Sequence, residues 1–155
     1  MSKWIAFFLF LLGLDVATKI VAIHFIPPLG FGGYPFGGIP LFSAGGITCS
    51  LNYVVNSGAA WGLFTGHSGL LFALRSAIIL ALLLFVPKRI PIWLVVTGAV
   101  GNAIDYCLYG HVIDFLHFTF WGYSFPIFNV ADSCISIGII GLLFLPRKAK
   151  EAKAL

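Results

Sequence analysis

The sequence predicts an all-α membrane protein with four transmembrane helices and a small extracytoplasmic β element. The first observation is composition: of the 155 residues, 60% are hydrophobic and 9% are charged, against roughly 25% charged in an ordinary soluble domain. The second is a set of four apolar segments, each about as long as a helix that crosses a bilayer. The third is a short stretch with the two-residue period of a β-strand, inside a long loop.

Prolines bound the four apolar segments. The first segment stops at Pro27-Pro28 and has no clear small-residue cleavage site, so we expect it to remain as an uncleaved span. The second ends before Pro87, the third begins at Pro91 and the fourth ends before Pro146. We therefore predict a single membrane domain, 1–155, with spans at about 4–26, 70–86, 91–108 and 128–145.

Basic residues predict the orientation of these spans. The loops 27–69 and 109–127 contain no Lys or Arg, whereas the two chain ends and the turn at 88–90 are basic. The positive-inside rule then places both termini in the cytoplasm and both loops outside. The net charge of +4 forms no basic patch with interleaved aromatic residues, so no nucleic-acid partner is expected. The three cysteines form no CxxC pair, so neither a zinc site nor a disulfide framework is indicated.

The first outer loop has two parts. Residues 27–46 are rich in Gly and Pro, which predicts turns lying over the membrane surface. From Ile47 to Tyr53 apolar and polar residues alternate, which predicts a half-exposed strand over about 47–55.

Four of the five acidic residues are aspartates inside or beside apolar segments. A carboxylate in hydrocarbon is costly unless it is paired, hydrated or protonated. Counted along their helices, Asp105 and Asp132 both lie roughly 21 Å above the cytoplasmic end. Asp114 follows Asp105 by nine residues and is expected slightly higher, at the outer interface, with Asp15 deeper at roughly 16 Å. The shared depth predicts one site near the outer leaflet.

Polar residues accompany these aspartates at helical spacing. Asn102 precedes Asp105 by three residues and Asn129 precedes Asp132 by three, so each pair can face one cavity. One such pair would be interpreted as a hydrogen-bonded link between helices; two at matched depth favour a site. Small residues that would let the third and fourth helices approach closely are Gly98, Gly101, Ala103 and Ala131.

Asp15 and Lys19 are spaced i, i+4 on the first segment, so their side chains can meet. We predict a self-neutralising structural pair, with a direct role in handling substrate as the alternative.

Paired carboxylates have a defined chemical use. Two that approach closely cannot both ionise easily, so one pKa rises. The ionised partner can take a proton from water while the protonated partner donates to the leaving group, as in aspartic proteases. This chemistry needs no metal or organic cofactor, and none is predicted.

The motifs resemble those of the lipoprotein signal peptidase (signal peptidase II) family, bacterial intramembrane aspartyl proteases, in content and in order over most of the chain. They are Asp15-x-x-x-Lys19, Asn56-Ser57-Gly58-Ala59-Ala60-Trp61-Gly62, Gly101-Asn102-Ala103-Ile104-Asp105, Gly110-His111-Val112-Ile113-Asp114-Phe115 and Phe128-Asn129-Val130-Ala131-Asp132-Ser133.

The resemblance implies cleavage of a prolipoprotein signal peptide just before a diacylglyceryl-cysteine, near the outer face of the bacterial cytoplasmic (inner) membrane. It implies a catalytic dyad of Asp114 and Asp132, and a mainly structural role for Asp15 and Lys19. It further implies a β-cradle around 47–55, membrane lipid and prolipoprotein as partners, and a monomer. The residues implied to line or support the site are Asn56, Asn102, Asp105, Asn129 and Ala131.

One departure from the family pattern concerns charge. The family usually carries an Arg directly after the aspartate of the third motif, where this chain has Tyr106. Arg75, in the second segment, is a candidate for supplying the missing charge from another helix; a side chain reaching the outer headgroups is the alternative.

Three other functions are alternatives to the protease. His111-x-x-Asp114-x-x-His117 on one helical face would suit a metal ion, although the resemblance accounts for His111 and Asp114 otherwise. Membrane carboxylates also mark proton-coupled carriers, for which four spans are few. A structural membrane subunit would use its polar residues only for assembly.

Overall fold

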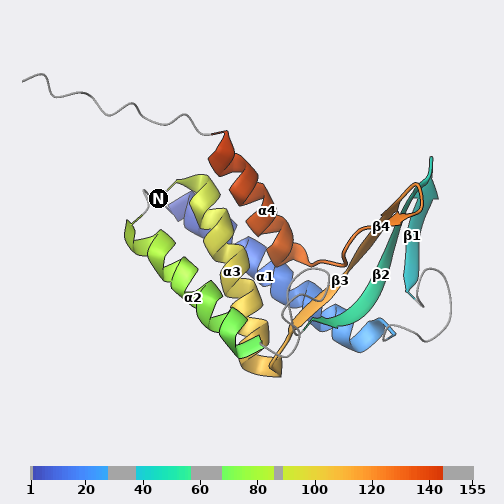
Figure 1. The fold of residues 1–155 in the computed structure, drawn as a ribbon, viewed down its shortest axis with the longest axis horizontal. Helices are drawn as coiled ribbons and strands as arrows, with labels where there is room; N and C mark the ends of the chain where they lie inside the picture. Colours follow the sequence, from blue (N-terminus) through green and yellow to red (C-terminus); the bar gives the residue numbers. More distant parts are fainter. Residues whose placement is uncertain (1, 28–37, 57–67, 86–88, 145–155) are drawn as a thin grey trace, which may run out of the picture.

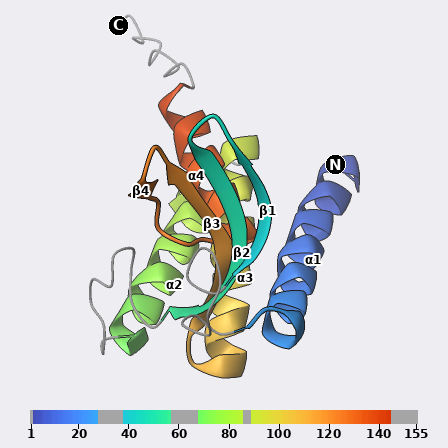
Figure 2. The same ribbon diagram turned by 90° about the vertical axis from the view of Figure 1, so that its right-hand side faces the viewer.

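A computed structural model describes residues 2–27, 38–56, 68–85 and 89–144 of the chain (Figure 1). It contains four helices and a small antiparallel sheet that extends away from one end of the helical bundle (Figures 1 and 2). The helices are α1 (Ser2–Phe25), α2 (Ser68–Phe85), α3 (Ile90–Tyr109) and α4 (Val130–Leu143). The strands are β1 (Ile39–Ala44), β2 (Ile47–Asn56), β3 (Val112–Phe120) and β4 (Tyr123–Ser124).

The four helices occupy the four apolar segments of the sequence. Two stretches, Lys3–Phe25 and Ile90–Tyr109, are long and apolar enough to cross a membrane. Within the described part of the chain the apolar parts of the other two helices, Phe72–Leu84 and Val130–Leu143, are shorter than a full crossing. The number of spans therefore stays a prediction.

Helix α3 is the centre of the bundle and contacts each of the other three helices. Small residues make its contact with α4 close, because a side chain at Gly98 would collide with the backbone oxygen of Ala131. At the other end of the same contact, a Cβ on Gly138 would lie 2.6 Å from the backbone oxygen of Pro91. The predicted close approach of these helices through small residues is thus observed.

The strands form one sheet in the order β1-β2-β3-β4, with every neighbouring pair antiparallel. The predicted strand over 47–55 is confirmed as β2. Strand β3 differs from the sequence prediction, which has only an outer loop over 109–127. Its content of Val, Ile, Phe and Thr is typical of a strand, but Asp114 and His117 interrupt a simple alternation of apolar and polar residues.

The sheet is joined to the bundle through the end of α1. Ala22 and Ile26 form a buried cluster with Ile113 and Phe115, the residues on either side of Asp114. Ile113 is fully buried. Because side chains alternate along a strand, burying these two neighbours turns Asp114 toward the opposite face of the sheet.

Two local backbone features bring α3, β3 and α4 together. Helix α3 ends at Gly110, which has φ 77° and donates its backbone N–H to the Tyr106 carbonyl, so the chain reverses directly into β3. Helix α4 begins with a capping box, in which the Asn129 side chain accepts from the Asp132 backbone N–H and the Asp132 side chain accepts from the Asn129 backbone N–H.

Candidate active site

The predicted site residues meet around the start of α4, where the C-terminal halves of α1 and α3 lie next to β2 and β3. Asp114 comes from β3 and is 2% exposed. Its Oδ2 accepts a hydrogen bond of 2.8 Å from Nδ2 of Asn56, the last residue of β2. Its Oδ1 accepts one of 2.7 Å from Nδ2 of Asn129. Both carboxylate oxygens of Asp114 are therefore satisfied by neutral amides.

Asp132 lies in the first turn of α4 and is less buried than Asp114. Its Oδ1 accepts a 2.8 Å hydrogen bond from Nδ2 of Asn102 on α3, and its Oδ2 accepts the backbone N–H of Asn129 at 3.4 Å. The N-terminus of a helix stabilises a nearby negative charge, so the position of Asp132 suits a carboxylate.

Asn129 connects the two aspartates. It is fully buried, and its Nδ2 contacts three acceptors: Oδ1 of Asp114, Oδ1 of Asn102 and the carbonyl of Ile113. Its Oδ1 accepts the backbone N–H of Asp132 at 2.8 Å. One side chain thus caps α4, orients Asp114 and fixes the backbone at Asp132. The sequence suggested only that Asn129 and Asp132 face one cavity.

A second polar cluster lies beside this network and is built around Lys19. The Lys19 ammonium lies 2.8 Å from Oδ2 of Asp15, 2.7 Å from Oδ2 of Asp105 and 3.1 Å from Oδ1 of Asn102. Lys19 and Asp15 are each 2% exposed. An ammonium has three donors, and these three partners use them all. The arrangement favours the predicted structural role of Asp15 and Lys19 over the alternative of direct contact with substrate.

The Lys19 cluster connects the elements that carry the two aspartates. Asp15 Oδ1 accepts the backbone N–H of Ala131, next to Asp132, at 2.8 Å. Asp105 Oδ2 accepts the backbone N–H of Ile113, next to Asp114, at 3.1 Å. Asp105 and Ala131 thus contact the site through residues next to Asp114 and Asp132, an arrangement compatible with the supporting role expected of them.

The environment of Asp114 is poor in positive charge. Burial, and then the charge of Asp132, raise the pKa of Asp114 to about 7, against the hydrogen bonds from Asn56 and Asn129, which lower it. The ordinary value for an aspartate is about 3.9. Near neutral pH this carboxyl group can therefore hold a proton and release it, which is the property that acid–base catalysis requires.

The metal alternative loses its geometric basis. It assumed a helix, but β3 is a strand, so residues three apart such as Asp114 and His117 lie on opposite faces. Nε2 of His117 lies 2.8 Å from Oγ of Ser124, at the β3–β4 end of the sheet. Among the described residues, no group of three His, Cys, Asp or Glu side chains is placed to hold a metal ion.

Tyr106 and Arg75 are the two residues of the hypothesis on the missing charge, and the structure describes the side chain of Tyr106 alone. Tyr106 stacks on Phe72 of α2, with ring centroids 4.6 Å apart and an interplanar angle of 17°. It makes an aromatic contact between α2 and α3 in place of a cation. The side chain of Arg75 lies outside the described part of the structure, as do residues 57–62 of the second sequence motif.

Comparison with known proteins assigns the family. The model of the family described as "Signal peptidase (SPase) II" matches residues 7–146. A lipoprotein signal peptidase of Chlamydia pneumoniae is 36% identical over 152 residues, covering 90% of this chain and 89% of the relative. A lipoprotein signal peptidase of Staphylococcus haemolyticus is 38% identical over 106 residues, covering 63% of this chain and 67% of the relative.

Solved structures agree with this assignment. One chain described as a bacterial membrane enzyme superposes with a TM-score of 0.74 at 29% identity, covering 97% of this chain and 96% of the other. A second, described in the same words, has a TM-score of 0.73 at 30% identity, with 92% and 91% covered. Together with the family match over most of the chain, they show that this protein belongs to the signal peptidase II family.

Proposed function

We propose that this protein is an aspartic endopeptidase that removes the signal peptide of prolipoproteins just before their diacylglyceryl-cysteine, with Asp114 and Asp132 as the catalytic dyad. Membership of the signal peptidase II family makes it a protease of lipoprotein signal peptides. The observation that carries the proposed mechanism is the shared partner of the dyad. Asn129 donates its side chain to Asp114 and its backbone N–H to Asp132, so the two carboxyl groups border one polar site.

The two aspartates differ in environment, and this supports different roles. Asp114 is buried and has a raised pKa, so it enters the reaction protonated. Asp132 accepts hydrogen bonds from Asn102 and from the start of α4, which favour a carboxylate. Asp132 then takes a proton from water as the water oxygen bonds to the scissile carbonyl carbon. When the C–N bond breaks, Asp114 gives its proton to the leaving amine, and the dyad retains one proton, now on Asp132.

The membrane setting of this reaction is part of the proposal. We propose four spans in the bacterial inner membrane, cytoplasmic termini, a site near the outer face and a monomeric enzyme whose substrate enters sideways from lipid. The basic residues at the chain ends and in the turn at 88–90 support this orientation. A site at the outer end of the bundle suits cleavage beside the hydrophobic helix of a signal peptide.

The decisive experiment uses the purified protein in detergent and a synthetic signal-peptide substrate with a diacylglyceryl-cysteine. Asp114→Asn and Asp132→Asn are each expected to lower kcat/KM by at least about 10³-fold while leaving the protein folded and able to bind substrate. Thr18→Val is the matched control, because among the described residues the Thr18 hydroxyl bonds only carbonyls of its own helix. It should keep near-parent activity.

Three results would reject the mechanism. One is substantial cleavage by either Asn variant. Another is activity that disappears with a chelator and returns with zinc. A third is coupled proton uptake into vesicles without any cleaved product, which would favour the carrier.

A further inference from the structure

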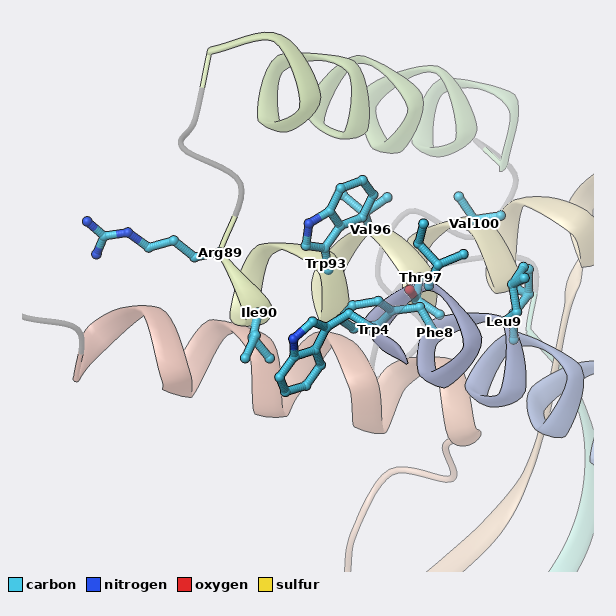
Figure 3. A pocket seen from close by; sticks show the side chains of 11 residues that line it. Trp4, Phe8, Leu9, Arg89, Ile90, Trp93, Val96, Thr97 and Val100 are labelled. Carbon is cyan, nitrogen blue, oxygen red and sulfur yellow. The ribbon is translucent and has the colours of Figure 1, made fainter. Parts of the chain in front are cut away.

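A groove separate from the candidate active site lies between the N-terminal halves of α1 and α3 (Figure 3). Its volume is about 650 Å³ and its walls are mostly apolar, with Trp4 on α1 and Trp93 on α3. The groove ends where the two helices come together, since a Cβ on Gly101 would lie 2.6 Å from Oδ2 of Asp15. The Lys19 cluster therefore separates it from the dyad.

The dimensions of the groove match one leaflet of a bilayer. Its lining extends from Trp4 to Leu12 on α1 and from Arg89 to Val100 on α3, which is about 12 Å and 16 Å along the helix axes. Half of a hydrocarbon core is about 15 Å. A helix about 10–12 Å wide and equally long would fill roughly 1,000 Å³, more than the groove offers. A lipid acyl chain is narrower and suits this volume.

The mouth of the groove is positively charged. Arg89 lies there at the start of α3, and its side chain extends outward, away from Ile90 and Trp93 (Figure 3). Among the residues that the structure describes, none forms a hydrogen bond or ion pair with the Arg89 guanidinium, and none at this end of the bundle is acidic. Lys3, beside Trp4, is exposed at the same end. A basic pocket between transmembrane helices is a recognised binding site for anionic lipid headgroups.

We infer that this groove binds an anionic glycerophospholipid, with an acyl chain between Trp4 and Trp93 and the phosphate at Arg89. The guanidinium gives a phosphate a bidentate partner, and the two indoles suit the boundary between headgroup and hydrocarbon. The lipid fills the space where α1 and α3 diverge, and so supports the contact of Gly101 with Asp15. This inference does not depend on the proposed catalytic mechanism.

Tryptophan fluorescence offers a direct test. The variant Trp61→Phe/Trp121→Phe keeps only Trp4 and Trp93, which both line the groove. It is reconstituted in phosphatidylcholine vesicles with increasing fractions of phosphatidylglycerol or phosphatidylcholine that carry brominated acyl chains. Phosphatidylglycerol should reach half-maximal quenching at about a fivefold lower fraction than phosphatidylcholine, and Arg89→Gln should abolish this difference. Arg89→Lys keeps the positive charge and should retain most of the preference for phosphatidylglycerol.

A second variant separates the groove from general attraction to the membrane surface. Val100→Phe fills the inner end of the groove and should weaken quenching by both lipids. Ile137→Phe, at a 59% exposed position on α4, is the matched control and should change neither. If Val100→Phe does not fold, the Arg89 variants still test whether the groove prefers the anionic lipid.

Several outcomes would overturn the inference. Equal quenching by the two lipids, or a preference that survives Arg89→Gln, would remove the headgroup site. Unchanged quenching in a folded Val100→Phe variant would remove the acyl-chain site. Loss of quenching when an apolar signal-peptide helix is added would assign the groove to substrate. Quenching that weakens as the protein concentration rises would assign the groove to a second copy of the chain.

Discussion

Two groups of aspartates lie side by side in this protein and have opposite surroundings. Asp15 and Asp105 share a buried ammonium, that of Lys19, whose donors are fully used. Asp114 accepts hydrogen bonds from the side-chain amides of Asn56 and Asn129, and Asp132 accepts them from the Asn102 side-chain amide and the Asn129 backbone N–H. A buried cation offsets the charge of neighbouring carboxylates, whereas neutral amides supply hydrogen bonds without a counter-charge. The first group is suited to holding helices together and the second to moving a proton.

The largest effect should come from removing the shared cation. Lys19→Met leaves Asp15 and Asp105 buried without a counter-charge, so we expect a loss of about 3–5 kcal/mol in the free energy of unfolding. Thermal denaturation in detergent measures it. The triple variant Lys19→Met/Asp15→Asn/Asp105→Asn removes the stranded charges and should recover much of the loss. Failure of that recovery would show that the ammonium acts through packing and not through charge.

Asn129 allows capping and catalysis to be separated. Asn129→Ala removes both the N-cap and the donor to Asp114, which should cost about 1 kcal/mol of stability and about 10²-fold in kcat/KM. Asn129→Ser keeps a capping oxygen but is too short to donate to Asp114. It should regain the stability and remain slow. A serine variant with full activity would contradict the role of Asn129 as the link between the aspartates.

These contrasts show which parts of the site were open to prediction from sequence. The common depth of the aspartates follows from counting, because a helix rises by a constant amount per residue. Which aspartates contact Lys19 and which accept hydrogen bonds from amides does not follow from counting. Asp105 and Asp114 are placed differently because the chain reverses at Gly110 and continues as a strand, and a turn of this kind changes the direction of every later side chain.

Side-chain contacts between residues far apart in the sequence also could not be predicted. Lys19 could be paired with Asp15 from helical spacing, but its contact with Asp105 depends on how closely α1 packs on α3. The Asn129 cap had a readable signal, an Asn followed three residues later by Asp before an apolar run. The predicted fourth span begins at about residue 128, whereas α4 begins at Val130 with Asn129 as its N-cap.

The pH dependence should also distinguish the two groups. The pKa of Asp114 is about 7 in the folded protein and about 3.9 in an unfolded chain, so the folded state binds the extra proton between these values. Its contribution to stability is full below about pH 4 and is lost as the pH rises through about 7. Asp114→Asn should lack this decline and be more stable than the parent at pH 8 by about 2 kcal/mol.

The pH dependence of kcat/KM should also report the loss of the proton on Asp114. As Asp114 loses it above about pH 7, kcat/KM should fall toward a tenfold decrease per pH unit. Denaturation and cleavage measured from pH 5 to 9 on one preparation test both statements. A parent protein whose stability rises over this range, or a flat activity profile up to pH 9, would contradict the assignment of Asp114 as the acid.

The smallest expected effects compare two glycines at different depths of the bundle. A Cβ on Gly101 would lie 2.6 Å from Asp15 Oδ2 and 3.2 Å from the Ala131 Cβ, whereas one on Gly13 meets nothing within 4 Å. Gly101→Ala should therefore push α1 from α3 and cost about 1–3 kcal/mol, with activity falling as Asp15 moves from the Ala131 N–H. Gly13→Ala should stabilise α1 by about 0.5–1 kcal/mol without changing kcat/KM. Because both add the same methyl group to the same pair of helices, equal responses would mean that the close contact at Gly101 does not position the dyad.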